Sequence, residues 1–549
     1  MRGAVLLAAF ACFHAAAHAD DIDALWAAKK RFGPDVRGAL SITRSGNGWQ
    51  AEIAGWLAPV QQDGSQLRFE LPPGEGSFRG RIVGRGIVGD WIQPPGMNLG
   101  MFFATPVRLA QVAPGRWRGD VEPVEDAITL FMPVRSGAAY LRNPERNAGR
   151  SIPMQRLVAE GGVAKAFGAE GKLLLEGKWD KARERLSLDL GDRGGWFDFH
   201  RATTADERAF LPRPSGQYTY RAPPAAGDGW RVGDAKDAGI DVAAIERFVQ
   251  MVIDTPMDSL RSQQLHAVLI ARHGKLVVEE YFHGTHRDEV HDTRSAAKVL
   301  TGLLAGAAGV PASTPVRPGI TLRDLMTMSS GLDCDDGDDN SRGNEDRIQD
   351  EHPKEDWGKI AFALPVVRPA GQKAAYCSMS MHLAGTVIAS TSGRWLPELF
   401  EERIAGPMQM RRYGLALAPE GEGYMGGGSR FTARDFLKLA QLMLDEGRWN
   451  GKQVVPAAWV RESLRPRFEM FDQRYGYQWW SVTYPYGDAT VDAYFAGGNG
   501  SQISMLIPAL DLAIVFLGGN YNMPAALVPQ REYVPKSILP AVSRRKSPG

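Results

Sequence analysis

A serine and a lysine stand close together at the start of an apolar segment, in the stretch HDTRSAAKVLTGLLAGAAG over residues 291–309. The small and apolar residues that follow predict a buried helix. Residues at i and i+3 of a helix are neighbours on one face, so the hydroxyl of Ser295 and the amine of Lys298 would lie within reach of each other. Burial lowers the pKa of a lysine, and a neutral amine can take the proton of a serine. The pair therefore predicts a nucleophile with its base, although a capping serine beside an exposed lysine gives the same spacing.

Two later segments contain groups that such a reaction needs. The stretch AAYCSMSMHLAG holds Tyr376 and Ser378 in a Tyr-x-Ser arrangement, and a phenol can relay a proton between a nucleophile and a leaving group. The stretch YFAGGNGSQISMLI places glycines at the entry to a strand, where a backbone N–H can stabilise an oxyanion. Each segment also has an ordinary structural interpretation, as a buried aromatic near a helix start and as a tight turn.

The surrounding elements predict how these residues are positioned. The segment HAVLIARHGKLVVEEYF, residues 266–282, is two β-rich runs broken at His273-Gly274 and predicts a hairpin. Helices are predicted at TLRDLMTM, MSMHLAGTVIAS and TARDFLKLAQLML. Two final strands are predicted on either side of Pro508 to Asp511. Strands at both ends with helices between them predict an α+β domain, an antiparallel sheet flanked by helices with a helical insert.

The part of the chain before this domain is rich in strands. Short alternating runs include GWQAEIAGW, QLRFELP, GRWRGDVEP, KLLLEGKWD and RLSLDLGDRGGWFDFHRA. They predict an all-β sandwich or barrel-like domain over residues 20–205. A Pro- and Gly-rich stretch then predicts a linker over residues 206–230, which leaves residues 231–549 for the α+β domain.

Composition and the N-terminus predict an exported protein. Lys+Arg 64 against Asp+Glu 63 gives a net charge of +1, so neither a nucleic-acid partner nor a charged membrane surface is expected. Residues 1–19 combine Arg2, an apolar stretch and Ala17-His18-Ala19, which predicts a signal peptide cleaved after Ala19 and a periplasmic or secreted product. No later run is long enough for a transmembrane segment. Two cysteines then remain, and an oxidising compartment favours their pairing.

The chain contains Ser-x-x-Lys, then Tyr-x-Ser, then a Gly-Gly strand edge. With these motifs in this order it resembles the penicillin-recognising serine hydrolases. Among them it is most similar to the class C beta-lactamase-like group of esterases, D-aminopeptidases and amide hydrolases. The resemblance covers roughly residues 225–535 and extends to ITLRDLMTMSSGL, YGYQWW and IPALDLAIVFLGGNYN. It implies a beta-lactamase/transpeptidase-like fold for this part of the chain. It implies no metal and no cofactor.

The resemblance also implies a role for each residue. Ser295 would be the acylated nucleophile, Lys298 the general base and Tyr376 a proton-transfer partner. Ser378 falls where the family has Asn or Ser, and the backbone N–H groups of Ser295 and Gly498 would form the oxyanion hole. The remaining implied residues are Phe495 and Gly497 on the substrate-lining strand and a disulfide between Cys334 and Cys377 beside the site.

One departure from the family pattern bears on the substrate. The strand motif of the family begins with Lys or His, whereas Phe495 stands at that position here. A phenyl ring cannot bind the carboxylate that β-lactams and peptide C-termini carry. The departure argues against an efficient beta-lactamase and favours neutral esters or amides.

We therefore predict an exported serine hydrolase that acts on a small-molecule ester or amide, with its oligomeric state left open. The alternatives are a cell-wall D-amino-acid peptidase or amidase, a weak beta-lactamase, and a catalytically silent ligand-binding protein on the same fold. The chain lacks G-x-S-x-G and H-E-x-x-H motifs, and its histidines show no zinc spacing. The acidic run at residues 333–339 fails the EF-hand spacing and predicts a solvated loop.

Overall fold

The computed structural model describes residues 22–46, 48–96, 102–145 and 151–543. The predicted signal peptide, residues 1–19, lies outside these ranges. By its internal contacts the chain divides into two compact units. The first comprises Met1–Ala28, Leu130–Arg142 and Gly149–Thr203, and the second comprises Lys29–Thr129, Asn143–Ala148 and Thr204–Gly549. The β-rich residues predicted as one domain are therefore divided between the two units.

The first unit is built on an eight-stranded antiparallel sheet in the order β11-β10-β1-β16-β15-β14-β13-β12. In that order the strands span Ala138–Ala139, Asp126–Arg135, Ala24–Gly33, Trp196–Arg201, Arg185–Asp189, Leu173–Asp180, Val163–Phe167 and Arg156–Glu160. The N–H of Leu157 donates a hydrogen bond to the carbonyl of Gly137 (2.7 Å), so the two ends of the sheet curl toward each other. Buried Trp26 and Trp179 meet edge to face, with ring centroids 5.8 Å apart.

The second unit begins with a closed antiparallel barrel of the strands β2 to β9. They span Gly38–Ser45, Gly48–Ile53, Trp56–Asp63, Gln66–Glu70, Ser77–Val83, Gly86–Gln93, Phe102–Ala113 and Arg116–Val121. Each strand pairs with the next along the chain, and β9 closes the ring by pairing with both β8 and β2. Buried apolar side chains such as Leu40, Phe69 and Trp91 fill the interior. The prediction of an all-β barrel-like region before the α+β domain is confirmed.

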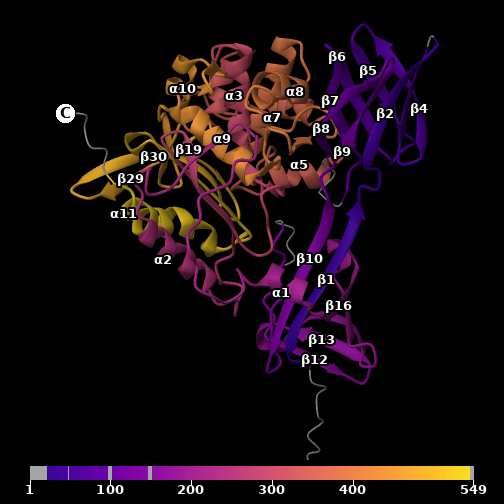
Figure 1. The fold of residues 1–549 in the computed structure, drawn as a ribbon, viewed down its shortest axis with the longest axis vertical. Coiled ribbons are helices and arrows are strands. Elements are labelled where there is room, and N and C mark those ends of the chain that lie inside the picture. The colour runs from indigo at the N-terminus through magenta and orange to yellow at the C-terminus, as the bar shows by residue number, and fades with distance from the viewer. Residues whose placement is uncertain (1–21, 47, 97–101, 146–150, 544–549) are drawn as a thin grey trace, which may run out of the picture. The chain divides into compact units, whose positions relative to one another are not determined.

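The rest of the second unit surrounds a nine-stranded sheet in the order β17-β19-β18-β32-β31-β30-β29-β28-β27. In that order the strands span Arg231–Val232, Lys275–Tyr281, Leu265–Arg272, Leu512–Gly518, Gln502–Ile507, Ala489–Gly498, Trp480–Tyr486, Gln473–Tyr475 and Phe468–Met470. Helix α9 (Ala433–Leu444) packs on one face of the sheet, while α2 (Val242–Ile253) and α11 (Leu539–Ala541) lie on the other side (Figure 1). The sheet is thus covered on both faces.

Most of the other helices lie between β20 (Val290–Asp292) and β24 (Arg430–Thr432). They are the 3-10 turn η3 (Arg294–Lys298), α3 (Val299–Ala308), α4 (Leu322–Met326), α5 (Glu345–Glu351), α6 (Trp357–Ala363), α7 (Ser378–Ser392), α8 (Leu396–Phe400) and its continuation η4 (Glu401–Ala405). Outside this insert lie α1 (Thr204–Phe210), α10 (Ala457–Leu464), η6 (Pro524–Leu527) and η7 (Pro529–Ile538). A sheet flanked by helices with a helical insert is the predicted fold class, which is confirmed.

Local sequence patterns identified many of these elements. The predicted hairpin is formed by β18 and β19, and its turn residues His273 and Gly274 have φ of 52° and 67°, the left-handed conformation that a two-residue turn requires. The predicted helices correspond to α4, α7 and α9, and the two final strands to β31 and β32. The strands β27, β28 and β29 were not predicted, because charged and turn residues interrupt the alternation within residues 468–486.

The barrel and the α+β domain share a sheet. Strand β23 (Tyr413–Leu417) pairs with β8 of the barrel, where Ala416 stands opposite Phe103. The ring of Phe103 is buried in the same apolar core as the α+β domain. An ion pair joins Arg108 of β8 to Glu401 of η4, with an N–O distance of 2.7 Å. The barrel is therefore continuous with the α+β domain in its hydrogen bonding, packing and charge pairing.

The segment predicted as a linker is held against the α+β domain. It begins within α1 and continues as coil. The hydroxyl of Tyr218 donates a hydrogen bond to Glu280 of β19, and the hydroxyl of Tyr220 donates one to the carbonyl of Val277 (2.8 Å). These contacts fix the path of the chain between its β-rich part and helix α2.

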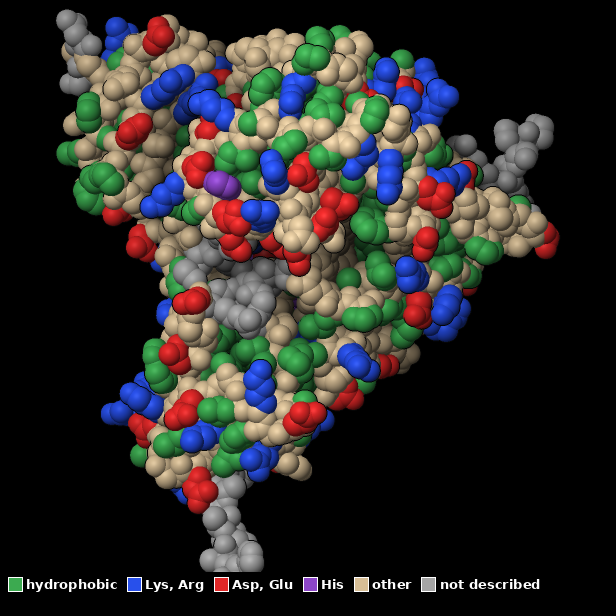
Figure 2. Space-filling view, turned by 180° about the vertical axis from the view of Figure 1, so that it is seen from behind, with side chains coloured by type: hydrophobic (Ala, Val, Ile, Leu, Met, Phe, Trp, Pro, Cys, Tyr) green, Lys and Arg blue, Asp and Glu red, His purple; other side chains and the backbone are tan. Residues whose placement is uncertain are grey.

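Charges of both signs are mixed on the surface. On the face drawn in Figure 2, Lys and Arg side chains are interspersed with Asp and Glu. The whole chain has nearly balanced totals of 64 basic and 63 acidic residues. Both signs are mixed on the face that Figure 2 shows. Within the described residues, no helix combines the length and apolarity that a bilayer span needs.

Candidate active site

Ser295 and Lys298 lie on the 3-10 turn η3, directly before helix α3. Side chains at i and i+3 eclipse each other in a 3-10 helix, because each turn contains three residues. The Nζ of Lys298 donates a hydrogen bond to the Oγ of Ser295 at 3.0 Å and a second one to the carbonyl of Gly426. Lys298 is buried, whereas Ser295 is half-buried and lines a cavity. The fold thus brings together the hydroxyl and the amine that the spacing singled out.

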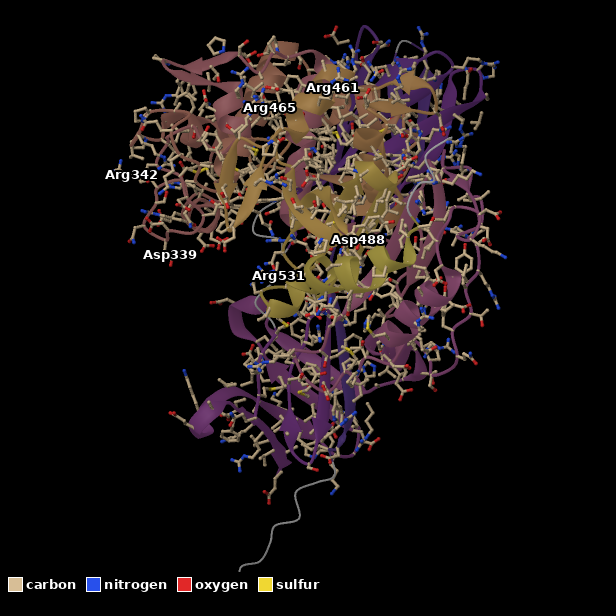
Figure 3. All side chains as sticks on the ribbon, turned by 90° about the vertical axis from the view of Figure 1, so that its left-hand side faces the viewer. Asp339, Arg342, Arg461, Arg465, Asp488 and Arg531 are labelled. Carbon is tan, nitrogen blue, oxygen red and sulfur yellow. A yellow bond between two sulfur atoms is a disulfide. The ribbon has the colours of Figure 1, made fainter. Side chains whose placement is uncertain are left out.

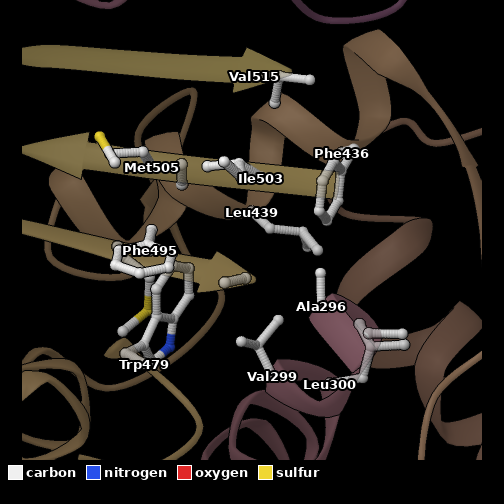
Figure 4. Close-up of a cluster of buried hydrophobic side chains, with 14 of the residues drawn as sticks. Ala296, Val299, Leu300, Phe436, Leu439, Trp479, Phe495, Ile503, Met505 and Val515 are labelled. Carbon is white, nitrogen blue, oxygen red and sulfur yellow. The ribbon is translucent and has the colours of Figure 1, made fainter. Parts of the chain in front are cut away.

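Apolar packing holds this turn in place. Apolar side chains on η3 and α3 pack with side chains of β31 and α9 in one buried cluster (Figure 4). Its labelled members include Ala296, Val299, Leu300, Phe436, Leu439, Ile503 and Met505. Close packing of this kind leaves little room for backbone movement. The backbone from which the two reactive side chains project is therefore rigid.

The charge of Lys298 differs from the sequence-based expectation. Burial by itself lowers the pKa of this amine, but attraction to Tyr376, Glu345 and Asp336 outweighs burial. The pKa of Lys298 is therefore raised above its ordinary value, and the side chain is an ammonium at neutral pH. This direction is opposite to the lowered pKa that burial alone predicts, because segments distant in the sequence supply the acidic partners.

Two carboxyl groups, Asp336 and Glu345, meet around Ser378. The N–H and the hydroxyl of Ser378 contact Oδ2 of Asp336 at 2.8 and 2.7 Å, and Oε2 of Glu345 lies 2.9 Å from the same hydroxyl. A hydroxyl has one proton, so both of its contacts are hydrogen bonds only when one carboxyl is protonated. Burial and repulsion from Glu345 raise the pKa of Asp336 to about 6. Asp336 therefore keeps its proton up to a higher pH than an exposed aspartate does.

Ser378 faces these carboxyls, and it is not among the described residues that line the cavity. Its predicted contact with substrate stays a prediction. The acidic run is only partly the solvated loop that was predicted. Asp339 is exposed, and Figure 3 shows it with Arg342 pointing away from the body of the domain, whereas Asp336 is half-buried.

Tyr376 lies beside the amine, with its ring centroid 4.9 Å from the Nζ of Lys298. The ring stacks on Trp480 at a centroid distance of 6.1 Å and an interplanar angle of 23°. The next residue, Cys377, forms a disulfide with Cys334, and their Cα atoms lie 5.5 Å apart. The predicted pairing is present, and it ties the acidic loop to the start of α7.

Strand β30 borders the other side of the site and ends at Gly498. A Cβ at Gly498 would lie 2.4 Å from the carbonyl oxygen of Thr293 and 3.0 Å from the nitrogen of Ala296. Only glycine therefore allows the strand to approach η3 this closely. The backbone of Gly498 runs alongside the turn that carries Ser295, as a shared oxyanion site requires.

One cavity of about 360 Å³ unites these groups. Five of the predicted residues line it, namely Ser295, Tyr376, Phe495, Gly497 and Gly498. Lys298 lies directly behind Ser295. A separate cavity of about 520 Å³, beside Arg108 and Arg434, contains none of the predicted residues.

Sequence reasoning missed several residues that line the cavity. Phe471 comes from the tip of the β27–β28 hairpin, and Leu527, Gln530 and Arg531 come from η6 and η7 after the last strand. Figure 3 labels Arg531 on this C-terminal helical segment. No motif marks these positions, because they reach the site only through the fold. Trp480 is buried and also lines the cavity.

Three histidines that show no zinc spacing in the sequence gather in the fold. The Nδ1 of His266 lies 2.7 Å from the Nε2 of His291, and the rings of His266 and His283 are 5.7 Å apart. Burial lowers the pKa of His291 to about 4, so this ring is neutral. In the part of the chain that the structure describes, no group of three or more His, Cys, Asp or Glu has the arrangement to hold a metal ion.

Comparison with known proteins finds a family model that matches part of the chain. Residues 258–518, just under half of the sequence, match a family model described as Beta-lactamase. Similar solved structures include a penicillin binding protein from Bacillus halodurans, with 16% identity, 49% of this chain and 97% of that chain covered and a TM-score of 0.40. They also include a family VIII carboxylesterase, with 13% identity, 53% and 94% coverage and a TM-score of 0.40. No curated protein is similar enough to count as a match. The family match confirms the predicted resemblance over residues 258–518.

Proposed function

We propose that this chain, whose residues 258–518 match the Beta-lactamase family, is a serine hydrolase that cleaves a small ester or amide through a covalent acyl-enzyme. The observation that carries the proposal is the 3.0 Å contact between Nζ of Lys298 and Oγ of Ser295 at the wall of an apolar cavity. Burying an ammonium costs free energy. Such a cost is expected where the charge activates a neighbouring nucleophile.

In the acylation step, the Oγ of Ser295 attacks the carbonyl carbon of the substrate. Because Lys298 already holds its proton, the oxygen of Tyr376 takes the serine proton as Oγ attacks and relays a proton toward the leaving group, beside the ammonium of Lys298. The N–H groups of Ser295 and Gly498 stabilise the oxyanion. When the C–O or C–N bond breaks, Tyr376 returns the proton to the leaving alcohol or amine, and an acyl ester remains on Ser295.

Deacylation reverses these roles with water as the nucleophile. Tyr376 takes a proton from the water, whose oxygen attacks the acyl carbon. The bond from that carbon to the Oγ of Ser295 then breaks, and Tyr376 returns the proton to Oγ. The products are a carboxylic acid and the free enzyme, so the cycle consumes one water and needs no other reactant.

The decisive experiment compares the wild type with Ser295→Ala. We expect a fluorophosphonate probe to label the wild type and p-nitrophenyl acetate to be hydrolysed by it. Both signals should vanish in the variant, with a fall in kcat/KM of about a thousandfold or more. Mass spectrometry should place the label on the peptide that contains Ser295. A wild type that neither labels nor turns over any acyl donor would support the silent ligand-binding alternative.

Neutral substrates are favoured over β-lactams and D-amino-acid peptides. The ring of Phe495 is buried in the cavity wall, at the position where the family pattern has a cation for a carboxylate. Arg531 is the cation that lines the cavity among the described residues, and it comes from a different element. We therefore expect little or no turnover of nitrocefin under conditions where p-nitrophenyl acetate is hydrolysed.

We also propose that the protein is exported. The leader predicted over residues 1–19 and the disulfide between Cys334 and Cys377 support this, since disulfides persist in oxidising compartments. N-terminal sequencing of the protein recovered from periplasm or medium should begin at Asp20. A cytoplasmic chain that retains Met1 would contradict the proposal.

A further inference from the structure

An exposed aromatic residue stands at the rim of the cavity. Strands β27 and β28 are joined by a two-residue turn, Phe471 and Asp472, with φ of 51° and 58°. Such turns favour Gly, Asn and Asp, because most other side chains are strained at positive φ. Phe471 is also 70% exposed, the largest fraction among the exposed large hydrophobic residues described. The position therefore combines backbone strain with an apolar surface left in water.

The ring of Phe471 faces the proposed catalytic centre. Its centroid lies 5.9 Å from that of Tyr376 and 6.1 Å from that of Trp480, and all three residues line the cavity with Ser295. Strained, exposed residues are retained mostly where they serve binding or catalysis. Asn or Gly would close the hairpin without the strain or the exposed apolar surface.

The rest of the cavity wall is largely apolar as well. Trp480 and Phe495 are buried, and Ile503 of β31 and Leu527 of η6 complete this wall. A volume of about 360 Å³ is at the lower end of the range for small-molecule sites. Aromatic rings attract one another at centroid separations of 4.5 to 7 Å, roughly the spacing already present around Phe471.

We propose that the cavity accepts substrates with an apolar acyl group, preferably an aromatic one, and that Phe471 is the residue that determines this preference. The proposal rests on the proposed serine hydrolase function. The acyl group would lie in the cavity against the rings of Phe471, Trp480 and Phe495, with its carbonyl carbon at the Oγ of Ser295. Contact with Phe471 would also shield the acyl-enzyme from water.

The test uses the mature chain and a series of p-nitrophenyl esters with acetyl, hexanoyl and phenylacetyl groups. For the wild type, kcat/KM should rise at least tenfold from acetate to phenylacetate. Phe471→Asn removes the ring and suits a positive φ, so its Tm should equal or exceed that of the wild type. Its kcat/KM should fall about tenfold for phenylacetate and hexanoate and less than about twofold for acetate. Phe471→Trp should retain the preference, and Glu469→Ala on the same hairpin is the control.

The outcomes separate this proposal from the function on which it rests. Ser295-dependent hydrolysis of acetate with no preference for apolar acyl groups overturns the role of Phe471 and leaves the hydrolase standing. An equal loss for all three esters in Phe471→Asn also overturns it, because the ring would then serve only to position Tyr376. Absence of any labelling or turnover in the wild type refutes the hydrolase itself.

Discussion

At the scale of single residues, the charge of one amine decides how the site can work. Lys298 and Ser295 are in contact as their spacing predicts, but the ammonium is stabilised by acidic groups that enter from other segments. The proposed mechanism therefore assigns the relay of the serine proton to Tyr376. In that proposal the lysine stabilises negative charge and orients the serine hydroxyl.

The carboxyl of Asp336 makes stability depend on pH. Its pKa is raised to about 6 in the folded protein, above the usual value near 3.8. Below about pH 4 both the folded and unfolded forms are protonated, whereas between pH 4 and pH 6 the unfolded chain ionises first and the folded state loses stability. The Asp336→Asn variant has no carboxyl at this position and does not lose stability in this way. The Tm of the variant minus the Tm of the wild type should therefore increase as pH rises from 4 to 7.

Thermal unfolding followed by circular dichroism at several pH values measures this difference. Asp338→Asn is the matched control, because Asp338 is an exposed residue of the same loop. A Tm difference for Asp336→Asn that does not change between pH 4 and pH 7 would contradict the assignment.

Gly498 should be intolerant of a side chain. A methyl group would meet the carbonyl oxygen of Thr293 at 2.4 Å and push β30 away from η3. We expect Gly498→Ala to lower kcat/KM for p-nitrophenyl acetate by about a hundredfold, as the loss of one oxyanion donor does. Gly497→Ala is the comparison, because the atoms nearest its Cβ would belong to the side chains of Phe495 at 3.1 Å and Trp480 at 3.6 Å and not to backbone. Equal activity in the two variants would argue against an oxyanion role for Gly498.

At the scale of elements, the site depends on contacts between segments that are far apart in the chain. The turn η3 provides Ser295, the start of α7 provides Tyr376, and β30 provides Gly498. The disulfide joins the acidic loop to the start of α7 across a sequence separation of 43. The turn η3 has only 5 residues, so its position is determined by its neighbours.

Removal of the disulfide should therefore affect both stability and activity. For a loop of this length, the chain-entropy model gives about 4 kcal/mol of unfolding free energy. We expect the double variant Cys334→Ala with Cys377→Ala to lose roughly that amount in urea unfolding and several-fold in kcat, since Tyr376 precedes Cys377. Reduction of the wild type with dithiothreitol should have the same effect and should leave the variant unchanged. Unaltered stability would show that the covalent link contributes nothing.

At the scale of the whole chain, the barrel and the α+β domain belong to one compact unit. Strand β23 forms backbone hydrogen bonds with β8 of the barrel, and Glu401 forms an ion pair with Arg108 of β8. An unpaired strand edge promotes aggregation. The barrel thus has a structural function whatever its further role.

A fragment of residues 204–549 should consequently fold poorly on its own. Without the barrel, β23 exposes its edge and the core loses Phe103. We expect this fragment to be largely insoluble, or soluble with a much lower Tm and no esterase activity, in comparison with residues 20–549. Size-exclusion chromatography and thermal unfolding measure both properties. A monomeric fragment with the Tm and activity of the longer chain would contradict this prediction.

The sequence by itself was sufficient for the features that depend on neighbouring residues. The contact of Ser295 with Lys298, the β18–β19 hairpin and the alternating strands of the barrel follow from periodicity over a few positions. Only the tertiary structure decided the charge of Lys298, the aromatic rim at Phe471 and the pairing of the barrel with β23. The physical reason is that electrostatic fields, cavity walls and sheet edges are formed by groups more distant in sequence than any local pattern extends.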